Sequence, residues 1–261
     1  VLCHGTPGSR LFSVPDPGVL DRAGVRLLTY DRPGYGGSTP RDGRTVADAA
    51  ADVSLVADAL TVQRFALVGF SGGGPHALAA AAGLSDRITR CAAVSSVAPM
   101  DATGLDFFAG MSQGNLDEFD AALGGRERLR AMLDPVAEAV ADDVYAFLAS
   151  LRAEMPEPDR IALDHPAVDR LMATSMAEGL RPGAAGWVED DLAFCRPWGF
   201  DVGRVRVQVG VWHGTEDTLV PASHAAWLCA NLPRAEGHLL VGAGHLGPLH
   251  EIDAILRWLT D

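Results

Sequence analysis

A serine bracketed by glycines constrains this chain more than any other feature. Residues 64–83 read "RFALVGFSGGGPHALAAAAG". The apolar run at 64–69 predicts a strand, and the alanine-rich run that ends at Gly83 predicts a helix. Between them lies a G-x-S-x-G pattern, which in this setting forms a strained turn that exposes the hydroxyl of Ser71. The small helix residues allow close packing on a sheet, and the helix N-terminus directs unpaired N–H groups at the serine.

Strand and helix signals alternate over the first hundred residues and again after residue 204. Strand-like runs occupy 25–30, 64–69, 88–99, 205–214 and the segment from 237, and helical patterns occupy 45–60, 75–83, 222–232 and 251–261. This alternation predicts an α/β fold, a mostly parallel sheet with helices on both faces. The acidic, proline-broken helical patterns between the two parts predict an insertion. We therefore expect a core of residues 1–98 and 205–261, with a helical insertion at 99–204.

Polar residues follow three of the predicted strands, at the edge where open parallel sheets bind ligands. Ser71 follows the strand at 64–69, Asp217 follows the strand at 205–212, and His245 is the histidine in the loop after the last strand. Glu216 is the main competitor for the acidic role, and Asp101 is the next candidate. A glycine-rich capping turn and a solvated acidic loop are the structural alternatives.

These three residues form a complete set for acyl transfer. His245 would take the proton of Ser71, while Asp217 would fix the imidazole tautomer and stabilise its protonated form. The backbone N–H groups of Thr6 and Gly72 would bind the oxyanion that develops on the substrate carbonyl. His4 is interpreted as a structural residue of the first loop.

Five segments together resemble the α/β-hydrolase superfamily. They are "HGTPGSR" (4–10), "DRPGYGGS" (31–38), "GFSGG" (69–73), "HGTEDTLVP" (213–221) and "GAGH" (242–245). The resemblance implies an α/β-hydrolase fold, a serine–acid–histidine triad, and a helical cap over the active site at about 99–204. The family also carries an N-terminal hairpin before the first motif. That hairpin is absent from this sequence, and we expect the sequence to be a fragment.

The resemblance implies hydrolysis of a carboxylic ester or lactone through an acyl-enzyme intermediate. Aromatic residues in and around the cap are expected to line an apolar substrate pocket, chiefly Phe70, Phe107 and Trp187. Arg10 and Arg32 are expected to form structural ion pairs rather than to bind a substrate carboxylate. Hydrolysis of a C–C bond, cofactor-free oxygenation and a non-catalytic small-molecule receptor remain the alternatives.

Composition removes several other classes of function. All 21 basic residues are arginine, so Schiff-base, Ser–Lys and P-loop lysine chemistry are excluded. A net charge of −13 argues against nucleic-acid and membrane partners, leaving a small-molecule substrate. The four cysteines have neither CxxC nor metal-ligand spacing, so no metal or other cofactor is expected. This cysteine usage favours a reducing, cytoplasmic location.

Overall fold

The sheet is parallel, and its strands lie side by side in chain order. The structure is a computed structural model that describes residues 1–261, apart from the side chain of Glu154. Over these residues the strands are β1 (Leu2–Cys3), β2 (Phe65–Phe70), β3 (Ile88–Val94), β4 (Gln208–Gly214) and β5 (Ala235–Leu240), in the order β1-β2-β3-β4-β5. All four neighbouring pairs are parallel, so each connection crosses over a face of the sheet. The expected α/β class is confirmed.

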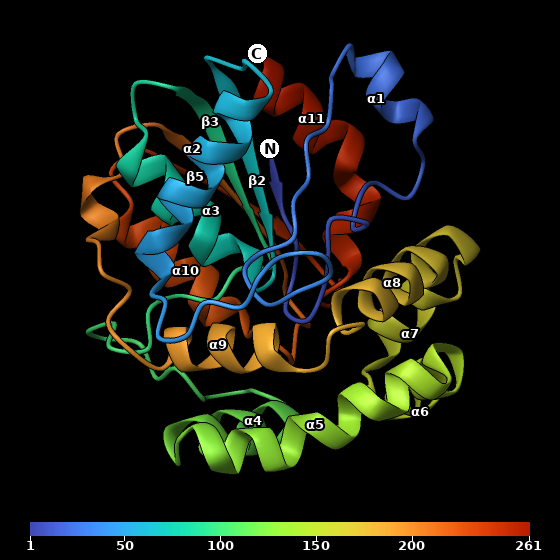
Figure 1. Cartoon of the computed structure of the whole chain (residues 1–261). Helices are drawn as coiled ribbons and strands as arrows, with labels where there is room; N and C mark the ends of the chain where they lie inside the picture. The colour runs from blue at the N-terminus through green and yellow to red at the C-terminus, as the bar shows by residue number, and fades with distance from the viewer.

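Helices cover both faces of the sheet (Figure 1). One face carries α2 (Ala49–Ala59), α3 (Gly73–Gly83) and α10 (Ala222–Asn231), and the other carries α1 (Gly18–Ala23) and α11 (Ile252–Thr260). Side chains that point alternately to the two faces of β2 divide the apolar core between those faces. Leu67 belongs to the cluster of the first face, while Val68 and Phe70 belong to the cluster of the second. The side-chain period of two thus produces two apolar layers from one buried strand.

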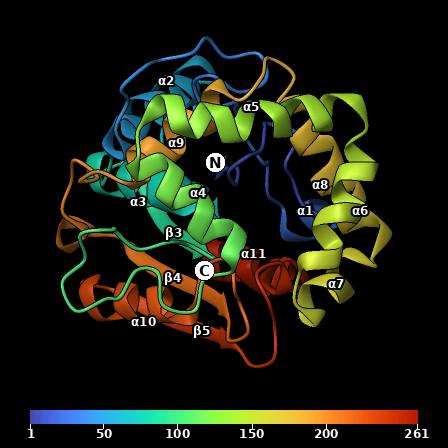
Figure 2. The same ribbon diagram turned by 90° about the horizontal axis from the view of Figure 1, so that it is seen from below.

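Six further helices lie beyond the carboxyl ends of the strands (Figures 1 and 2). They are α4 (Gln113–Leu123), α5 (Arg126–Asp142), α6 (Val144–Glu154), α7 (Glu157–Leu163), α8 (Pro166–Gly179) and α9 (Ala185–Phe194). All six fall within 99–204, the range predicted for the helical insertion. Figure 1 shows α9 between the sheet and the pair α4 and α5. In the described part of the chain, no helix combines the length and apolar character that a membrane crossing needs.

The structure differs from the sequence prediction at one edge of the sheet and at the start of one helix. The segment 25–30 forms no ladder and contributes a single parallel bridge between Leu2 and Thr29. Its neighbour β1 is only two residues long, which leaves little strand to pair with. The helix expected at 45–60 begins with a 3₁₀ turn, η1 (Val46–Asp48), before α2. Thr45 precedes it as expected, and Asp48 Oδ2 accepts from the Thr45 backbone N–H at 2.7 Å. Two more 3₁₀ turns are η2 (Val202–Arg204) and η3 (Gly247–Glu251).

Candidate active site

Ser71 occupies a strained turn between β2 and α3. Its φ is +52°, which is uncommon for a residue with a side chain. The turn is held by a hydrogen bond from the Ser71 N–H to Val94 O at 2.8 Å and by one from the Gly74 N–H to Ser71 O at 2.9 Å. A Cβ on Gly69 would collide with Gly73 O, so the chain can turn this tightly only without side chains there. The glycines of the motif therefore allow the conformation that exposes the serine.

His245 and Asp217 form a buried hydrogen-bonded pair. The Nδ1 of His245 donates to Oδ2 of Asp217 at 2.8 Å, because an ionised carboxylate can only accept. Asp217 Oδ1 accepts from the backbone N–H groups of Leu219 at 2.9 Å and Val220 at 2.8 Å. His213, which the sequence analysis did not select, lies with its Nε2 3.3 Å from Asp217 Oδ2. The carboxylate is thus fixed by its own loop and by the strand before it.

The pair shifts the pKa values of both members in opposite directions. Burial opposes the charge on each group, but their mutual attraction outweighs it. The pKa of His245 is raised above 6.5 because Asp217, and more weakly Asp159, favour the imidazolium. The pKa of Asp217 is lowered because His245 and His213 stabilise the carboxylate against the cost of burial. An imidazole in this position is a stronger base than one in water.

Thr6 and Gly72, the predicted oxyanion donors, lie against each other beside Ser71. A Cβ on Gly72 would collide with Thr6 Oγ1, and one on Gly5 would lie 3.5 Å from the Cβ of Ser71. Within the described side chains, no hydrogen bond joins Ser71 to His245. Contacts between a nucleophile and its base are often long before substrate binds.

A small cavity of about 90 Å³ opens over the nucleophile. Strand-end loops and helices of the 99–204 segment line it together: Thr6, Ser71, Gly72, Val97, Asn115, Glu118, Phe119, Asp191, Phe194, Leu219 and Val220. Apolar side chains alternate in its walls with the serine end, the amide of Asn115 and two carboxyl groups. Apolar walls with a few placed polar groups are typical of a small-molecule binding site.

Comparison with known proteins assigns the family. A family model described as alpha/beta hydrolase fold matches residues 1–251. The chain belongs to this family. This membership supports a hydrolase enzyme.

Three relatives span most of this α/β hydrolase. A non-heme chloroperoxidase from Streptomyces lividans is 29% identical over 211 residues, covering 80% of this chain and 70% of that protein. The enol-lactonase from Burkholderia xenovorans LB400 superposes with a TM-score of 0.70 at 19% identity, covering 100% of this chain and 88% of that one. The esterase RhEst1 from Rhodococcus sp. ECU1013 has a TM-score of 0.68 at 19% identity, covering 100% and 89%. The two structures bear on the fold alone.

The aromatic residues predicted to bind substrate in this hydrolase lie just outside the small cavity. Phe70 stacks on Phe12 with ring centroids 5.0 Å apart and lies 5.4 Å from the His245 ring. Phe107 packs in the core, edge-on to Phe119 at 5.1 Å. Trp187 is buried, and its indole N–H donates to Glu118 Oε1 at 2.7 Å. These rings support the lining residues, whereas Phe119 and Phe194 form the wall itself.

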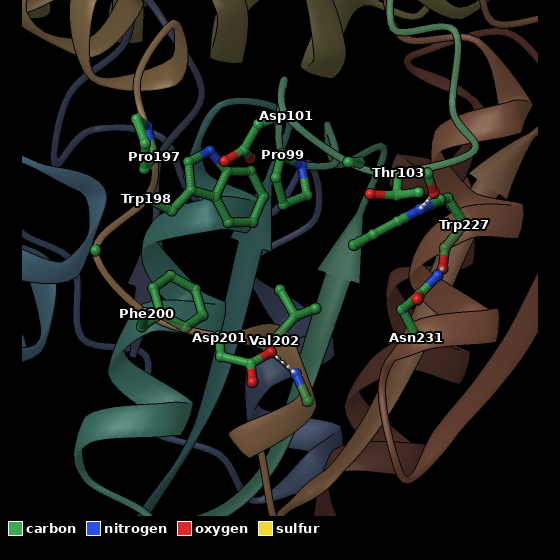
Figure 3. Close-up of a pocket in the computed structure, with 13 residues that line it drawn as sticks. Pro99, Asp101, Thr103, Pro197, Trp198, Phe200, Asp201, Val202, Trp227 and Asn231 are labelled. Atoms are coloured by element: carbon green, nitrogen blue, oxygen red, sulfur yellow. Dashed lines mark hydrogen bonds between the residues drawn. The ribbon is translucent and has the colours of Figure 1, made fainter.

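A larger, open cavity of about 740 Å³ lies elsewhere on the hydrolase (Figure 3). Trp198 and Phe200 stand on one side of it, and Trp227 and Asn231 stand on the other. Asp101, the reserve candidate for the triad, lines this cavity. Glu216 is exposed, so Asp217 is the carboxylate that contacts His245.

A buried ion cluster ties α9 to the strand-end loops of the hydrolase. Asp190 accepts from Arg32 Nη2 at 2.6 Å, and its other oxygen lies 2.6 Å from Arg44 Nη2. The hydroxyls of Thr6 and Tyr35 also donate to it, at 2.7 and 2.8 Å. Burial raises the pKa of Asp190, but the two guanidinium groups outweigh that cost and hold the pKa well below its usual range. Arg32 is therefore a structural ion pair, as expected.

Arg10, the other arginine considered for binding a substrate carboxylate, also forms ion pairs. Arg10 Nη1 contacts Asp31 Oδ2 at 2.5 Å and Glu178 Oε1 at 2.8 Å. His76, which follows Ser71 on α3, is buried with its Nδ1 2.8 Å from Gly72 O. Neither Arg10 nor His76 lines the small cavity over Ser71.

Asp159 is a site residue that the sequence analysis missed. It lies on α7, fully buried, and its Oδ1 accepts from the Leu246 N–H at 2.8 Å. It therefore holds the loop that carries His245. Nothing in the sequence marks it, because it is one acidic residue among many in a helical pattern.

Proposed function

We propose that this hydrolase cleaves a carboxylic ester or lactone of a small, largely apolar substrate through an acyl-enzyme. The observation that carries the proposal is the buried Asp217–His245 pair, together with a serine at positive φ at the same edge of the sheet. A G-x-S-x-G turn that carries a nucleophile holds its serine in such a strained conformation. The six helices of 99–204 would act as a cap that encloses the substrate.

In the proposed mechanism, Ser71 Oγ attacks the carbonyl carbon of the ester while Nε2 of His245 takes the hydroxyl proton. The tetrahedral oxyanion is held by the N–H groups of Thr6 and Gly72. His245 then protonates the leaving alkoxide as the C–O bond breaks. A water molecule, activated by the same imidazole, cleaves the acyl-enzyme and restores Ser71.

The second candidate is cofactor-free oxygenation, which is oxidative chemistry, as is the reaction for which the chloroperoxidase relative is named. A cofactor-free oxygenase would work chiefly through the His245–Asp217 pair and would keep much of its activity without the serine. Hydrolysis requires the serine. Replacement of Ser71 therefore separates the two candidates.

The test is release of p-nitrophenol from acetate, butyrate and octanoate esters by the wild type, Ser71→Ala and Ser223→Ala. Ser223 is an exposed serine on α10 and serves as the control. We expect Ser71→Ala to lose at least about 10³-fold in kcat and Ser223→Ala to lose nothing. The short esters should be preferred, because the cavity is small.

A fluorophosphonate that labels wild type but not Ser71→Ala would identify the nucleophile even if none of these esters is turned over. Retention of most turnover by Ser71→Ala would overturn the proposal. Absence of both turnover and label in the wild type would do the same.

A further inference from the structure

Two carboxyl groups from different helices line the cavity over Ser71. Glu118 comes from α4 and Asp191 from α9, and these helices pack against each other beyond the sheet (Figure 2). Asp191 is only 3% exposed, and its Oδ2 is buried without a hydrogen-bond partner. Buried carboxylate oxygens are normally satisfied, so an unfilled acceptor beside the nucleophile needs an explanation.

The two carboxyl groups are packed together, and the pKa of each is raised. Burial raises the pKa of Glu118, and burial together with Glu118 raises the pKa of Asp191 well above its usual range. They face each other, and a hydrogen bond between them requires that one be protonated. The Trp187 indole N–H already donates to Glu118 Oε1. Glu118 thus has a partner for one oxygen, and Asp191 Oδ2 is left as the buried acceptor without one.

Among the described residues, no basic side chain belongs to the rest of the cavity wall. Its other members are apolar or uncharged, and Asn115, the one lining amide, donates to Leu219 O at 2.7 Å. The nearby guanidinium groups of Arg32 and Arg44 contact Asp190 instead. Two carboxyl groups between apolar walls, one with an unpartnered oxygen and neither with a basic partner, favour a ligand that brings both a hydrogen-bond donor and a positive charge.

We propose that Glu118 and Asp191 bind a protonated primary amino group of the substrate, an inference that rests on the proposed function of Ser71. An ammonium group offers three donors, enough for Asp191 Oδ2 and a Glu118 oxygen. In the bound state one carboxyl group is ionised and the other keeps its proton, so the ammonium group and the carboxyl pair together are neutral. An alkyl group of the same shape would leave the acceptor unfilled. A hydroxyl would fill it without compensating the charge.

The first experiment measures protection of Ser71 from a fluorophosphonate. Propylammonium is compared with 1-propanol, with sodium chloride at equal ionic strength as the salt control. We expect saturable protection of the wild type by propylammonium and at least tenfold weaker protection by 1-propanol. Asp191→Asn keeps the shape of the side chain and should weaken propylammonium protection at least tenfold. Asp117→Asn, an exposed change on the same α4, should leave it unaltered.

A substrate pair provides the second readout. Ethyl β-alaninate and ethyl butyrate differ only by an ammonium in place of a methyl group. We expect the wild type to favour the amino ester at least tenfold in kcat/KM and Asp191→Asn to lose that preference. Equal protection by 1-propanol, or full propylammonium protection in Asp191→Asn, would overturn the proposal.

Failure of the proposed function gives a different result. If the wild type is not labelled at all, Ser71 is not a nucleophile, and calorimetric titration with propylammonium decides the binding proposal alone. Wild-type binding that Asp191→Asn loses supports the subsite, and its absence overturns it. If Asp191→Asn does not fold, Glu118→Gln carries the same comparison.

Discussion

Asp190 and Asp191 are neighbours on α9, are equally buried, and behave in opposite ways. Asp190 faces two arginines, and its pKa is held well below the usual range against the cost of burial. Asp191 faces Glu118, and burial and that second carboxyl raise its pKa well above the usual range. Successive helix residues point about 100° apart, so adjacent side chains meet different surroundings. Burial alone therefore predicts neither the charge of a carboxyl group nor its role.

The contrast between Asp190 and Asp191 distinguishes a carboxylate that stabilises the fold from one that we propose binds a ligand. Asp190 joins α9 to the loops that carry Thr6 and Arg32, so its charge is used inside the protein. Asp191 lines a cavity and has a buried oxygen without a partner, so it is the carboxyl group that we propose for recognition of a ligand. Asp217 resembles Asp190 in being ionised by its partners, but its partner is the proposed base.

The largest effect should come from Asp217, the ionised carboxylate that serves the reaction. Asp217→Asn removes the charge that stabilises the imidazolium and the acceptor that sets its tautomer. We expect kcat for the preferred ester to fall by about 10⁴-fold. Glu216→Gln, the exposed neighbour, should change it little. Similar losses in both variants would show that the wrong carboxylate has been assigned.

Asp190→Asn tests the structural half of the comparison. It leaves Arg32 and Arg44 buried without a counter-charge, which costs about 3–5 kcal/mol of unfolding free energy. Urea unfolding at pH 7 measures this loss. The folded pKa of Asp190 lies below its unfolded value, so its contribution is present at neutral pH and is lost as pH falls through the folded pKa. A loss under about 1 kcal/mol at pH 7 would remove the distinction between Asp190 and a surface ion pair.

Asp191→Asn should change the free energy of unfolding in the opposite direction and stabilise the protein. The raised folded pKa means that stability is lost as pH rises above the unfolded value, because deprotonation is penalised by burial and by Glu118. An asparagine amide can still donate to Glu118 and removes this penalty. We expect a gain of about 1 kcal/mol near pH 8 and none near pH 4. A destabilisation as large as that of Asp190→Asn would show that the two residues share one structural role.

The smallest effect should be a shift in the pH profile. His245 must be neutral to accept a proton, and its pKa is raised, so kcat/KM should fall with an acid limb above pH 6.5. Asp159→Asn removes one of the charges that raise this pKa while the amide oxygen can still accept from the Leu246 N–H. The limb should move to lower pH by a fraction of a pH unit. Asp164→Asn, an exposed change just after α7, should leave it in place, and an equal shift in both would assign the effect to net charge.

Most of the fold could be predicted because each part has a local signal. The apolar runs that became β2, β3 and β4 and the glycine pattern around Ser71 depend on short stretches of sequence. The segment 25–30 was the exception. Its apolar run suggests a strand, but a ladder needs a partner, and the two-residue β1 provides one bridge.

The sequence by itself determined that Ser71, Asp217 and His245 each follow a strand. Because the carboxyl ends of parallel strands meet at one edge of the sheet, it also determined that these residues lie at that edge. It could not determine the lining of the cavity, which comes from helices that are distant in sequence. Glu118, Asp159, Asp190 and Asp191 all read as ordinary acidic residues of helical patterns. Only the tertiary structure decided that one meets arginines, one holds a loop and two face each other. The charge state of a buried carboxyl group depends on the groups packed against it, and those contacts exist only in the folded chain.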